Sequence, residues 1–328
     1  MMRSSTVQNE IRDIIGESND FYITGHINPD GDSIGACFGL GLALEKMGKK
    51  VQVLLEPFHH KYDVIPGKHL MRNGTGNVFA NQHHTDPVLI CVDCADTGRL
   101  MDEAKKLLET LSCTVNIDHH YSNPQFACYN LVDRDASSTC EMIYQVLDGL
   151  VDFDKPMAAA LYAGMVGDTG GFRHSSTSQE TMTVAGKLIA LGIPFTKIYT
   201  EVLQSRSYTE IKLLARVLDA CIRSDGGRIV HVCVTADMMV GLKDAPDATT
   251  QDLEGMVEHL LNTRGAKAAF IVYDAGHGEV KISLRSRELN VGDIAQQLGG
   301  GGHRLAAGAT VKGNIFEIRD RVLKLCKR

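Results

Sequence analysis

The sequence predicts an α/β fold in two parts, in which a doubly wound parallel sheet forms the N-terminal domain and a smaller α+β domain follows it. Three observations indicate this fold class. The chain has 328 residues, which is longer than a domain with a single hydrophobic core usually is. Short apolar runs alternate with helical patterns through the first half, as in parallel sheets covered by helices. The pattern changes after Gly192-Ile193-Pro194, where a polar helical stretch leads to an apparent hairpin and a glycine cluster.

The expected elements divide the chain into three segments. We expect the N-terminal domain to span residues 1–192, a helical connector residues 193–221, and the C-terminal domain residues 222–328. The N-terminal strands are expected at 21–25, 51–55, 88–92 and 113–117, and the helices at 33–49, 157–166 and 178–191. In the C-terminal domain we expect a strand at 228–234, a helix at 250–262, a hairpin at 267–287 and a final helix at 314–327. An active-site cleft is expected between the two domains.

Composition and charge limit the classes of function. Apolar residues make up 44% of the chain and charged residues 23%, as in ordinary globular proteins. No apolar run reaches the ~18 residues that span a bilayer, and the polar N-terminus is unlike a signal peptide. We therefore expect a cytoplasmic protein that does not bind membranes. A net charge of -6 argues against a broad basic surface for long nucleic acid, but it leaves room for a short phosphorylated ligand.

The nine cysteines are an odd number, which favours free thiols in a reducing compartment over a disulfide framework. Cys91 and Cys94 form a C-x-x-C pair. No second pair complements them, and zinc needs about four ligands. We expect them to pack in the core.

A polar segment between the first strand and the first helix contains His26, Asp30 and Asp32. In parallel sheets, ligands bind just beyond the carboxyl ends of the strands, which is where this segment falls. Asp30 and Asp32 are two residues apart, so an extended backbone directs both the same way. Ser33 is expected to cap the helix that follows.

Acidic and histidine residues also follow the other strands. Asp93 follows the third expected strand, Asp118-His119-His120 the fourth, and Asp168 closes a helical stretch. A single strand-end aspartate more often caps a turn, but these sites converge at one edge of the sheet. With Asp30 and Asp32 they bring together carboxylates that would repel one another, and two divalent cations would balance their charge. Imidazole and carboxylate ligands suit Mn²⁺, Fe²⁺ or Co²⁺.

These motifs resemble those of the DHH phosphoesterases, whose name describes Asp118-His119-His120. The other motifs of that family stand here as His26-Ile27-Asn28-Pro29-Asp30-Gly31-Asp32, Val92-Asp93-Cys94-Ala95-Asp96 and Gly167-Asp168-Thr169-Gly170. The DHH-associated C-terminal domain is matched by Ser283-Leu284-Arg285-Ser286 and Gly299-Gly300-Gly301-Gly302-His303. The resemblance covers almost the whole chain, and no motif departs from the pattern. In length and layout the chain is similar to the nano-RNase/pAp-phosphatase group of the family.

The resemblance implies roles for these residues. One ion would bind His26, Asp30 and Asp93. The other would bind Asp32, Asp93, His119 and Asp168, with Asp93 bridging the two. Among the catalytic residues, His120 would face the scissile phosphate and Asp118 would orient its neighbours. A hydroxide held between two cations would then attack phosphorus in line.

The C-terminal motifs indicate where phosphate would be held. The run Gly299 to Gly302 can form an anion-binding nest, although a tight loop is an equally good interpretation of the run alone. The resemblance implies that Arg285 and His303 grip the substrate phosphate, and we expect contacts from Gly301, Gly302 and Arg99 as well. Other polar or aromatic residues have plainer interpretations. Tyr121 is expected to pack rather than stack on a base, and solvation is expected for His59, His60, His83 and His84.

We therefore expect a Mn²⁺-dependent phosphodiesterase and phosphatase. It would cut short oligoribonucleotides to mononucleotides and convert 3′-phosphoadenosine-5′-phosphate (pAp) to AMP. An inorganic pyrophosphatase or exopolyphosphatase is the first alternative, and a non-catalytic nucleotide sensor the second. The sequence leaves open whether the chain forms a homodimer.

Overall fold

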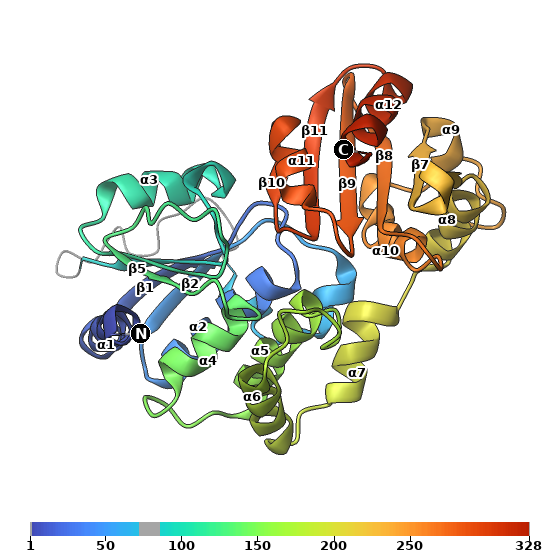
Figure 1. Ribbon diagram of the computed structural model, residues 1–328. Coiled ribbons are helices and arrows are strands. Elements are labelled where there is room, and N and C mark those ends of the chain that lie inside the picture. The colour runs from blue at the N-terminus through green and yellow to red at the C-terminus, as the bar shows by residue number, and fades with distance from the viewer. Residues whose placement is uncertain (1, 72–85, 328) are drawn as a thin grey trace. The chain divides into compact units, whose positions relative to one another are not determined.

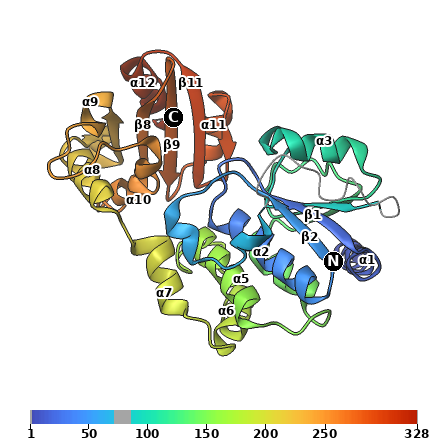
Figure 2. The same cartoon turned by 180° about the vertical axis from the view of Figure 1, so that it is seen from behind.

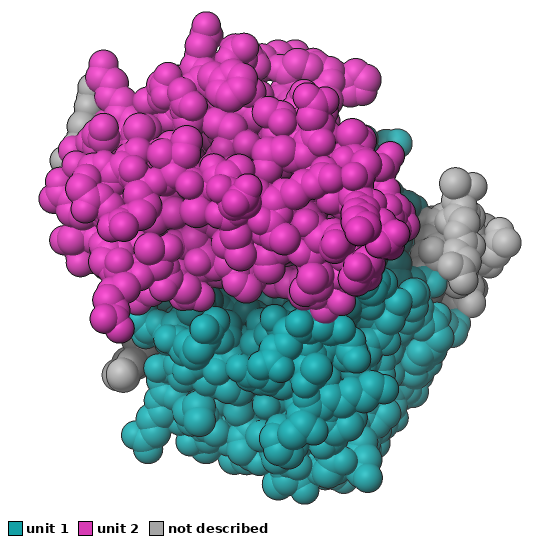
Figure 3. Space-filling view, turned by 90° about the vertical axis from the view of Figure 1, so that its right-hand side faces the viewer, with its two compact units in different colours: residues 1–205 teal, residues 206–328 magenta. Residues whose placement is uncertain are grey.

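The computed structural model describes residues 2–71 and 86–327 (Figure 1). The chain divides into two compact units, residues 1–205 and 206–328, coloured separately in Figure 3. The division falls inside the segment expected to connect the domains, 193–221. Its two halves belong to different cores, because Ile198 is buried in the first unit and Leu213 in the second.

The first unit is built on a five-stranded sheet in the order β2-β1-β3-β4-β5, and every neighbouring pair is parallel. Its strands are β1 (Asp20–Thr24), β2 (Lys50–Leu54), β3 (Val88–Val92), β4 (Thr114–Asp118) and β5 (Tyr129–Val132). The sequence did not predict β5, a four-residue edge strand in which only Leu131 is fully buried. Such a strand lacks the apolar run that marks the central ones.

Helices cover both faces of this sheet, which confirms the predicted doubly wound fold. The helices of this unit are α1 (Met2–Glu17), α2 (Gly31–Lys46), α3 (Asp102–Thr110), α4 (Thr139–Leu147), α5 (Lys155–Asp168), α6 (Gln179–Ala190) and α7 (Phe195–Tyr199). Figures 1 and 2 show α3 on one side of the sheet and α2, α4 and α5 on the other. The side chains of β1 alternate accordingly. Phe21 and Ile23 join the large core with α2 and α5, whereas Tyr22 packs on the side of α3.

The second unit has a six-stranded mixed sheet in the order β10-β11-β9-β8-β7-β6, in which β7 and β8 pair in parallel. Its strands are β6 (Ile222–Ser224), β7 (Ile229–Val234), β8 (Ala268–Gly276), β9 (Glu279–Ser286), β10 (Gly301–Gly302) and β11 (Ala306–Lys312). Its helices are α8 (Tyr208–Asp219), α9 (Ala236–Met239), α10 (Met256–Leu261), α11 (Val291–Gln297) and α12 (Ile315–Cys326). Residues of α8 and α10 pack on one face, and those of α11 and α12 on the other. The sheet confirms the predicted α+β class.

One expected helix of this unit is broken. The stretch 250–262 forms a short turn, Thr250–Leu253, and then α10, separated by Gly255 in the left-handed region at φ 74°. A helix cannot continue through that conformation. Further short helical turns are His60–Val64, Lys68–Leu70, Thr97–Arg99, Thr200–Gln204 and Asp225–Gly227.

The cysteines behave as expected, since all nine are free thiols. Cys91 and Cys94 are buried together in the core on the α3 side of the sheet. None of the helices formed by residues 2–71 and 86–327 is both long and apolar enough to cross a membrane.

Candidate functional site

The predicted site residues of the first unit lie together at the carboxyl end of the parallel sheet. His26 and Asp30 follow β1, Asp93 follows β3, and His119 follows β4. Asp168 is the last residue of α5, and its carboxylate lies 3.6 Å from Nε2 of His119. Residues from four separate segments therefore meet at one place, as the strand-end rule predicts.

The relation between Asp30 and Asp32 differs from the prediction. Asp30 caps α2, because its Oδ1 accepts the N–H groups of Asp32 at 3.0 Å and Ser33 at 3.1 Å. The helix begins at Gly31, so the expectation that Ser33 is the cap was wrong. Asp32 lies in the first helical turn rather than on an extended backbone, and its side chain is buried while that of Asp30 is half exposed. The two carboxylates thus have different surroundings.

Asp93 is shared between two groups of potential ligands. Its Oδ2 lies 3.6 Å from Nε2 of His26, which is also 3.7 Å from Oδ2 of Asp30. Its Oδ1 lies 3.6 Å from Nε2 of His119, which is also 4.0 Å from Oδ2 of Asp32. Each oxygen of one carboxylate therefore faces a different histidine.

These separations fit divalent cations better than direct hydrogen bonds. Within each of the two groups all donor atoms lie within 4.8 Å of one another. Two atoms that each lie about 2.1 Å from one ion are roughly 3–4 Å apart, whereas a hydrogen bond needs about 2.7–3.2 Å. The residues present are thus suited to hold one ion with His26 and another with His119, and both ions would share Asp93.

The histidine rings are oriented for this role by the opposite nitrogen. Nδ1 of His26 lies 2.8 Å from the carbonyl oxygen of Ile27, and Nδ1 of His119 lies 3.3 Å from that of Ala136. A carbonyl oxygen only accepts hydrogen bonds, so Nδ1 carries the proton in both rings. Nε2 then bears the lone pair that a metal ion binds.

The backbone and the charges at Asp93 are unusual. Asp93 has φ 52°, a left-handed conformation that aspartate tolerates better than most residues. Burial raises the pKa of its carboxyl well above the usual range, and the neighbouring Asp32 and Asp30 raise it further. Burial also raises the pKa of Asp32. A cation would relieve both effects, because it compensates the buried negative charge.

Removing divalent ions is therefore expected to destabilise the first unit. At a Mn²⁺ concentration 100-fold above its dissociation constant, binding adds about 2.7 kcal/mol, which corresponds to a rise of roughly 5–10 °C in Tm for a unit of this size. Differential scanning calorimetry of the chelated protein, with and without Mn²⁺, measures the difference. An unchanged Tm would contradict the assignment.

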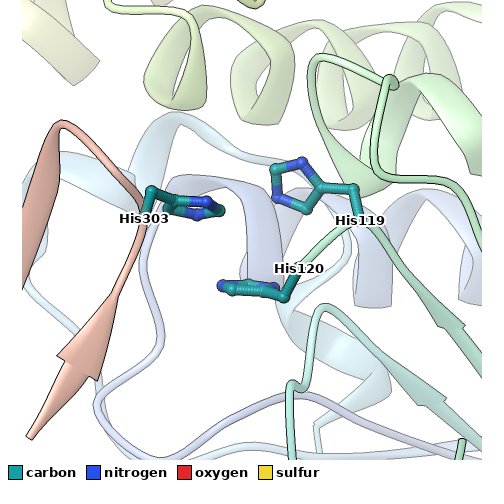
Figure 4. Close-up of side chains that lie close together, drawn as sticks. All are labelled: His119, His120 and His303. Carbon is teal, nitrogen blue, oxygen red and sulfur yellow. The ribbon is translucent and has the colours of Figure 1, made fainter. Parts of the chain in front are cut away.

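His120 has a different partner from the other two histidines. Its Nδ1 lies 2.7 Å from Oδ1 of Asp118, and Oδ2 of Asp118 accepts a hydrogen bond of 2.6 Å from the amide of Asn123. Burial opposes ionisation of Asp118, but these hydrogen bonds lower its pKa to about 2. Figure 4 shows the ring of His120 at a steep angle to that of His119, with an interplanar angle of 70°. The ionised carboxylate of Asp118 can only accept a hydrogen bond, so it orients the ring of His120 through a proton on Nδ1.

A further group of contacts was missed from the sequence. Thr139 and Cys140, at the start of α4, donate backbone hydrogen bonds to Asp32 at 2.6 and 3.0 Å. The signal was present, because Ser138 and Glu141 form the S-x-x-E pattern that marks a helix start. The missed helix supplies the polar surroundings of Asp32.

The predicted residues of the second unit share one end of its sheet. Arg285 on β9 lies opposite Ala306 on β11, and Ala306 exchanges backbone hydrogen bonds with His303 (labelled in Figure 4). The side chain of Arg285 donates to Glu258 at 2.8 Å. A side chain at Gly302 would meet Ala306 and Ala307 at 2.6 Å, so packing by itself requires that glycine.

The remaining predicted residues have simple environments. The carbonyl of Arg99 accepts the N–H of Ile27 at 2.7 Å, which places Arg99 beside the His26 segment. Among residues 2–71 and 86–327, no heavy atom would lie within 4 Å of a Cβ atom added at Gly301. Tyr121 is 67% exposed, so the expectation that it packs was wrong. His83 and His84 lie outside the described residues.

Comparison with known proteins identifies the family. Residues 20–165 match the model of the DHH family, N-terminal domain, and residues 229–328 match the DHHA1 domain. The bifunctional oligoribonuclease and PAP phosphatase NrnA of Thermus thermophilus is 30% identical over 314 residues, which cover 92% of this chain and 88% of that protein. The chain belongs to the DHH family. Asp168 lies just beyond the matched DHH segment, so its place in the site rests on the geometry described above.

Two solved structures share the DHH fold. An exopolyphosphatase-related protein from Bacteroides fragilis has a TM-score of 0.84 at 23% identity, covering 98% of this chain and 96% of that one. The exonuclease RecJ bound to manganese has a TM-score of 0.52 at 15% identity, covering 98% and 94%. At these identities the likeness concerns the fold alone.

Proposed function

We propose that this chain is a metal-dependent hydrolase that cuts short oligoribonucleotides to mononucleotides and converts pAp to AMP. The observation that carries the proposal is Asp93, whose two oxygens face two separate histidine and carboxylate groups. The name of the Thermus thermophilus relative supports the choice of substrates. We further propose that two ions bind and that both are Mn²⁺, which suits imidazole and carboxylate ligands and which RecJ of the same fold holds.

In this proposal His26, Asp30 and Asp93 hold one ion, and the other binds Asp93 together with Asp32, His119 and Asp168. When bound, such ions polarise the phosphate and lower the pKa of a coordinated water. The chain supplies the rest of the chemistry. Asp118 orients the ring of His120 through Nδ1, and a protonated His120 would donate from Nε2 to a phosphate oxygen as negative charge develops.

The second unit is proposed to bind the part of the substrate that does not react. Arg285 presents a planar guanidinium with donors for a phosphate or carboxylate, and its bond to Glu258 limits the orientations it adopts. His303 lies in the turn next to the residue opposite Arg285. Together they would recognise a phosphorylated nucleotide end.

Replacing Arg285 with Gln is expected to raise KM for pAp about 10-fold or more and to change kcat little. A charge-assisted hydrogen bond contributes about 1.5–3 kcal/mol, and the bond proposed here forms to a part of the substrate that does not react. Steady-state kinetics on pAp measures the effect. Lys281→Gln is the control, because it removes an exposed cation from the same strand. Equal KM values for wild type and Arg285→Gln would refute this role.

A substrate panel tests the proposed function. The Mn²⁺-loaded protein would be incubated with pAp, the dinucleotide pApA, a 24-nucleotide RNA and pyrophosphate, and the products separated by chromatography. We expect AMP from pAp, mononucleotides from pApA and slow cleavage of the long RNA. Turnover of pyrophosphate without nucleotide products would favour a pyrophosphatase instead. Mn²⁺ binding without any turnover would favour a nucleotide sensor.

A further inference from the structure

The segment that leads into α4, residues 137–141, has no part in the function proposed so far. Ser137, Ser138 and Thr139 are all completely buried, and Glu141 is 3% exposed. Polar residues are buried at this depth only when they are hydrogen bonded, so each of them should have a defined partner. Those partners include the candidate metal ligands.

Thr139 contacts two of these ligands at once. Its backbone N–H donates to Oδ2 of Asp32 at 2.6 Å, and its side-chain hydroxyl donates to Oδ1 of Asp93 at 3.2 Å. Oδ1 is the oxygen of Asp93 that faces His119, whereas Oδ2 faces His26. The hydroxyl therefore contacts the oxygen that belongs to the His119 group.

The position of Thr139 is fixed by its neighbours on α4. Ser138 caps the helix by accepting the N–H of Glu141 at 3.1 Å. The carboxylate of Glu141 turns back and accepts hydrogen bonds from Ser137 and from Thr181 of α6, the latter at 2.8 Å. The start of the helix is thus tied to α6 as well as to the site.

The other end of α4 is also held. The guanidinium of Arg12 on α1 donates to the carbonyl oxygens of Gln145, Val146 and Asp148 at 2.6 to 3.0 Å. These carbonyls lie where a helix leaves its acceptors unpaired, and a cation there stabilises the helix end. A helix anchored at both ends can hold Thr139 rigidly against the two carboxylates.

We propose that Thr139 is a positioning residue that sets the orientation of the Asp93 carboxylate and so the cation affinity of the Asp32, Asp93 and His119 group. The inference rests on the proposed function, since it assumes that this group holds an ion. Without the hydroxyl, Asp93 loses the hydrogen bond that keeps one oxygen toward each histidine. The hydroxyl contacts the Asp93 oxygen that faces His119, so we expect the cation affinity of the His119 group to fall more than that of the His26 group.

The test compares Thr139→Val, which removes only the hydroxyl, with Thr139→Ser, which keeps it. Mn²⁺ binding to the chelated proteins would be followed by electron paramagnetic resonance, and hydrolysis of pApA would be measured over a range of Mn²⁺ concentrations. We expect Thr139→Val to weaken binding of one ion about 10- to 100-fold, to weaken binding of the other less, and to recover activity at high Mn²⁺. Thr139→Ser should bind both ions like wild type.

Thr183→Val is the matched control, because Thr183 is exposed on α6 and its hydroxyl donates to the carbonyl oxygen of Gln179 in the same helix. Wild-type affinity for both ions in Thr139→Val would overturn the inference. Equal weakening in the Val and Ser variants, with a lower Tm in both, would also overturn it and indicate a packing role. The binding measurement needs no substrate, so failure of wild type to cut pApA would count against the proposed function alone. Absence of Mn²⁺ binding by wild type would refute both.

Discussion

Replacing Asp93 with Asn is expected to lower kcat for pApA by about 10³-fold. Asn offers one ligand oxygen in place of two and carries no negative charge, so both groups that share Asp93 lose a ligand or a charge. Loss of several kcal/mol of transition-state stabilisation corresponds to this factor. Asn also tolerates the left-handed backbone at this position, so the fold should survive. Steady-state kinetics and a Mn²⁺ binding isotherm measure the change.

Asp96→Asn is the control for this variant. Asp96 is exposed three residues further along the chain, and it caps the turn Thr97–Arg99 by accepting the N–H of Gly98 at 2.8 Å. Asn caps such turns equally well, so activity should be unchanged. If Asp93→Asn retained more than about a tenth of wild-type kcat, Asp93 would not be the shared ligand.

Replacing His120 with Asn is expected to lower kcat by about 10²- to 10⁴-fold while Mn²⁺ binding stays the same. The variant removes the Nε2 donor that Asp118 orients but none of the atoms that the proposal assigns to the ions. Kinetics on pApA and a Mn²⁺ binding isotherm separate the two properties. His69→Asn serves as the control, because His69 is exposed and pairs with Glu45 on α2. Loss of a bound ion in His120→Asn would show that His120 is itself a ligand.

Much of the first unit could be predicted because its central strands are buried segments rich in apolar residues, and polar residues follow directly after them. The position of Asp93 or His119 follows directly from where a buried strand stops. The orientation of Asp32 could not be derived in the same way. It depends on a helix start, and the cap that decides it is Asp30 rather than Ser33. A cap is a single hydrogen-bonding choice among several suitable residues, so the sequence alone does not select it.

The contacts around the site were harder to predict than the site itself. Thr139 reaches Asp32 and Asp93 across 107 and 46 residues of sequence, and no local pattern specifies such partners. For Tyr121 the sequence predicted packing that the structure does not show. This aromatic residue follows a buried strand, but its side chain is exposed. In the second unit, close packing against Ala306 and Ala307 is enough to explain the glycine at position 302, whether or not the glycine run binds phosphate.

The number of cations needed for hydrolysis tests the account most directly. The chelated protein would be titrated with Mn²⁺ while bound metal and pApA hydrolysis are measured in the same samples. We predict that hydrolysis is absent without metal and rises with the second ion bound per chain, because both oxygens of Asp93 must then be engaged. Full hydrolysis by the metal-free protein, or with one ion per chain, would contradict a centre in which Asp93 joins two cations.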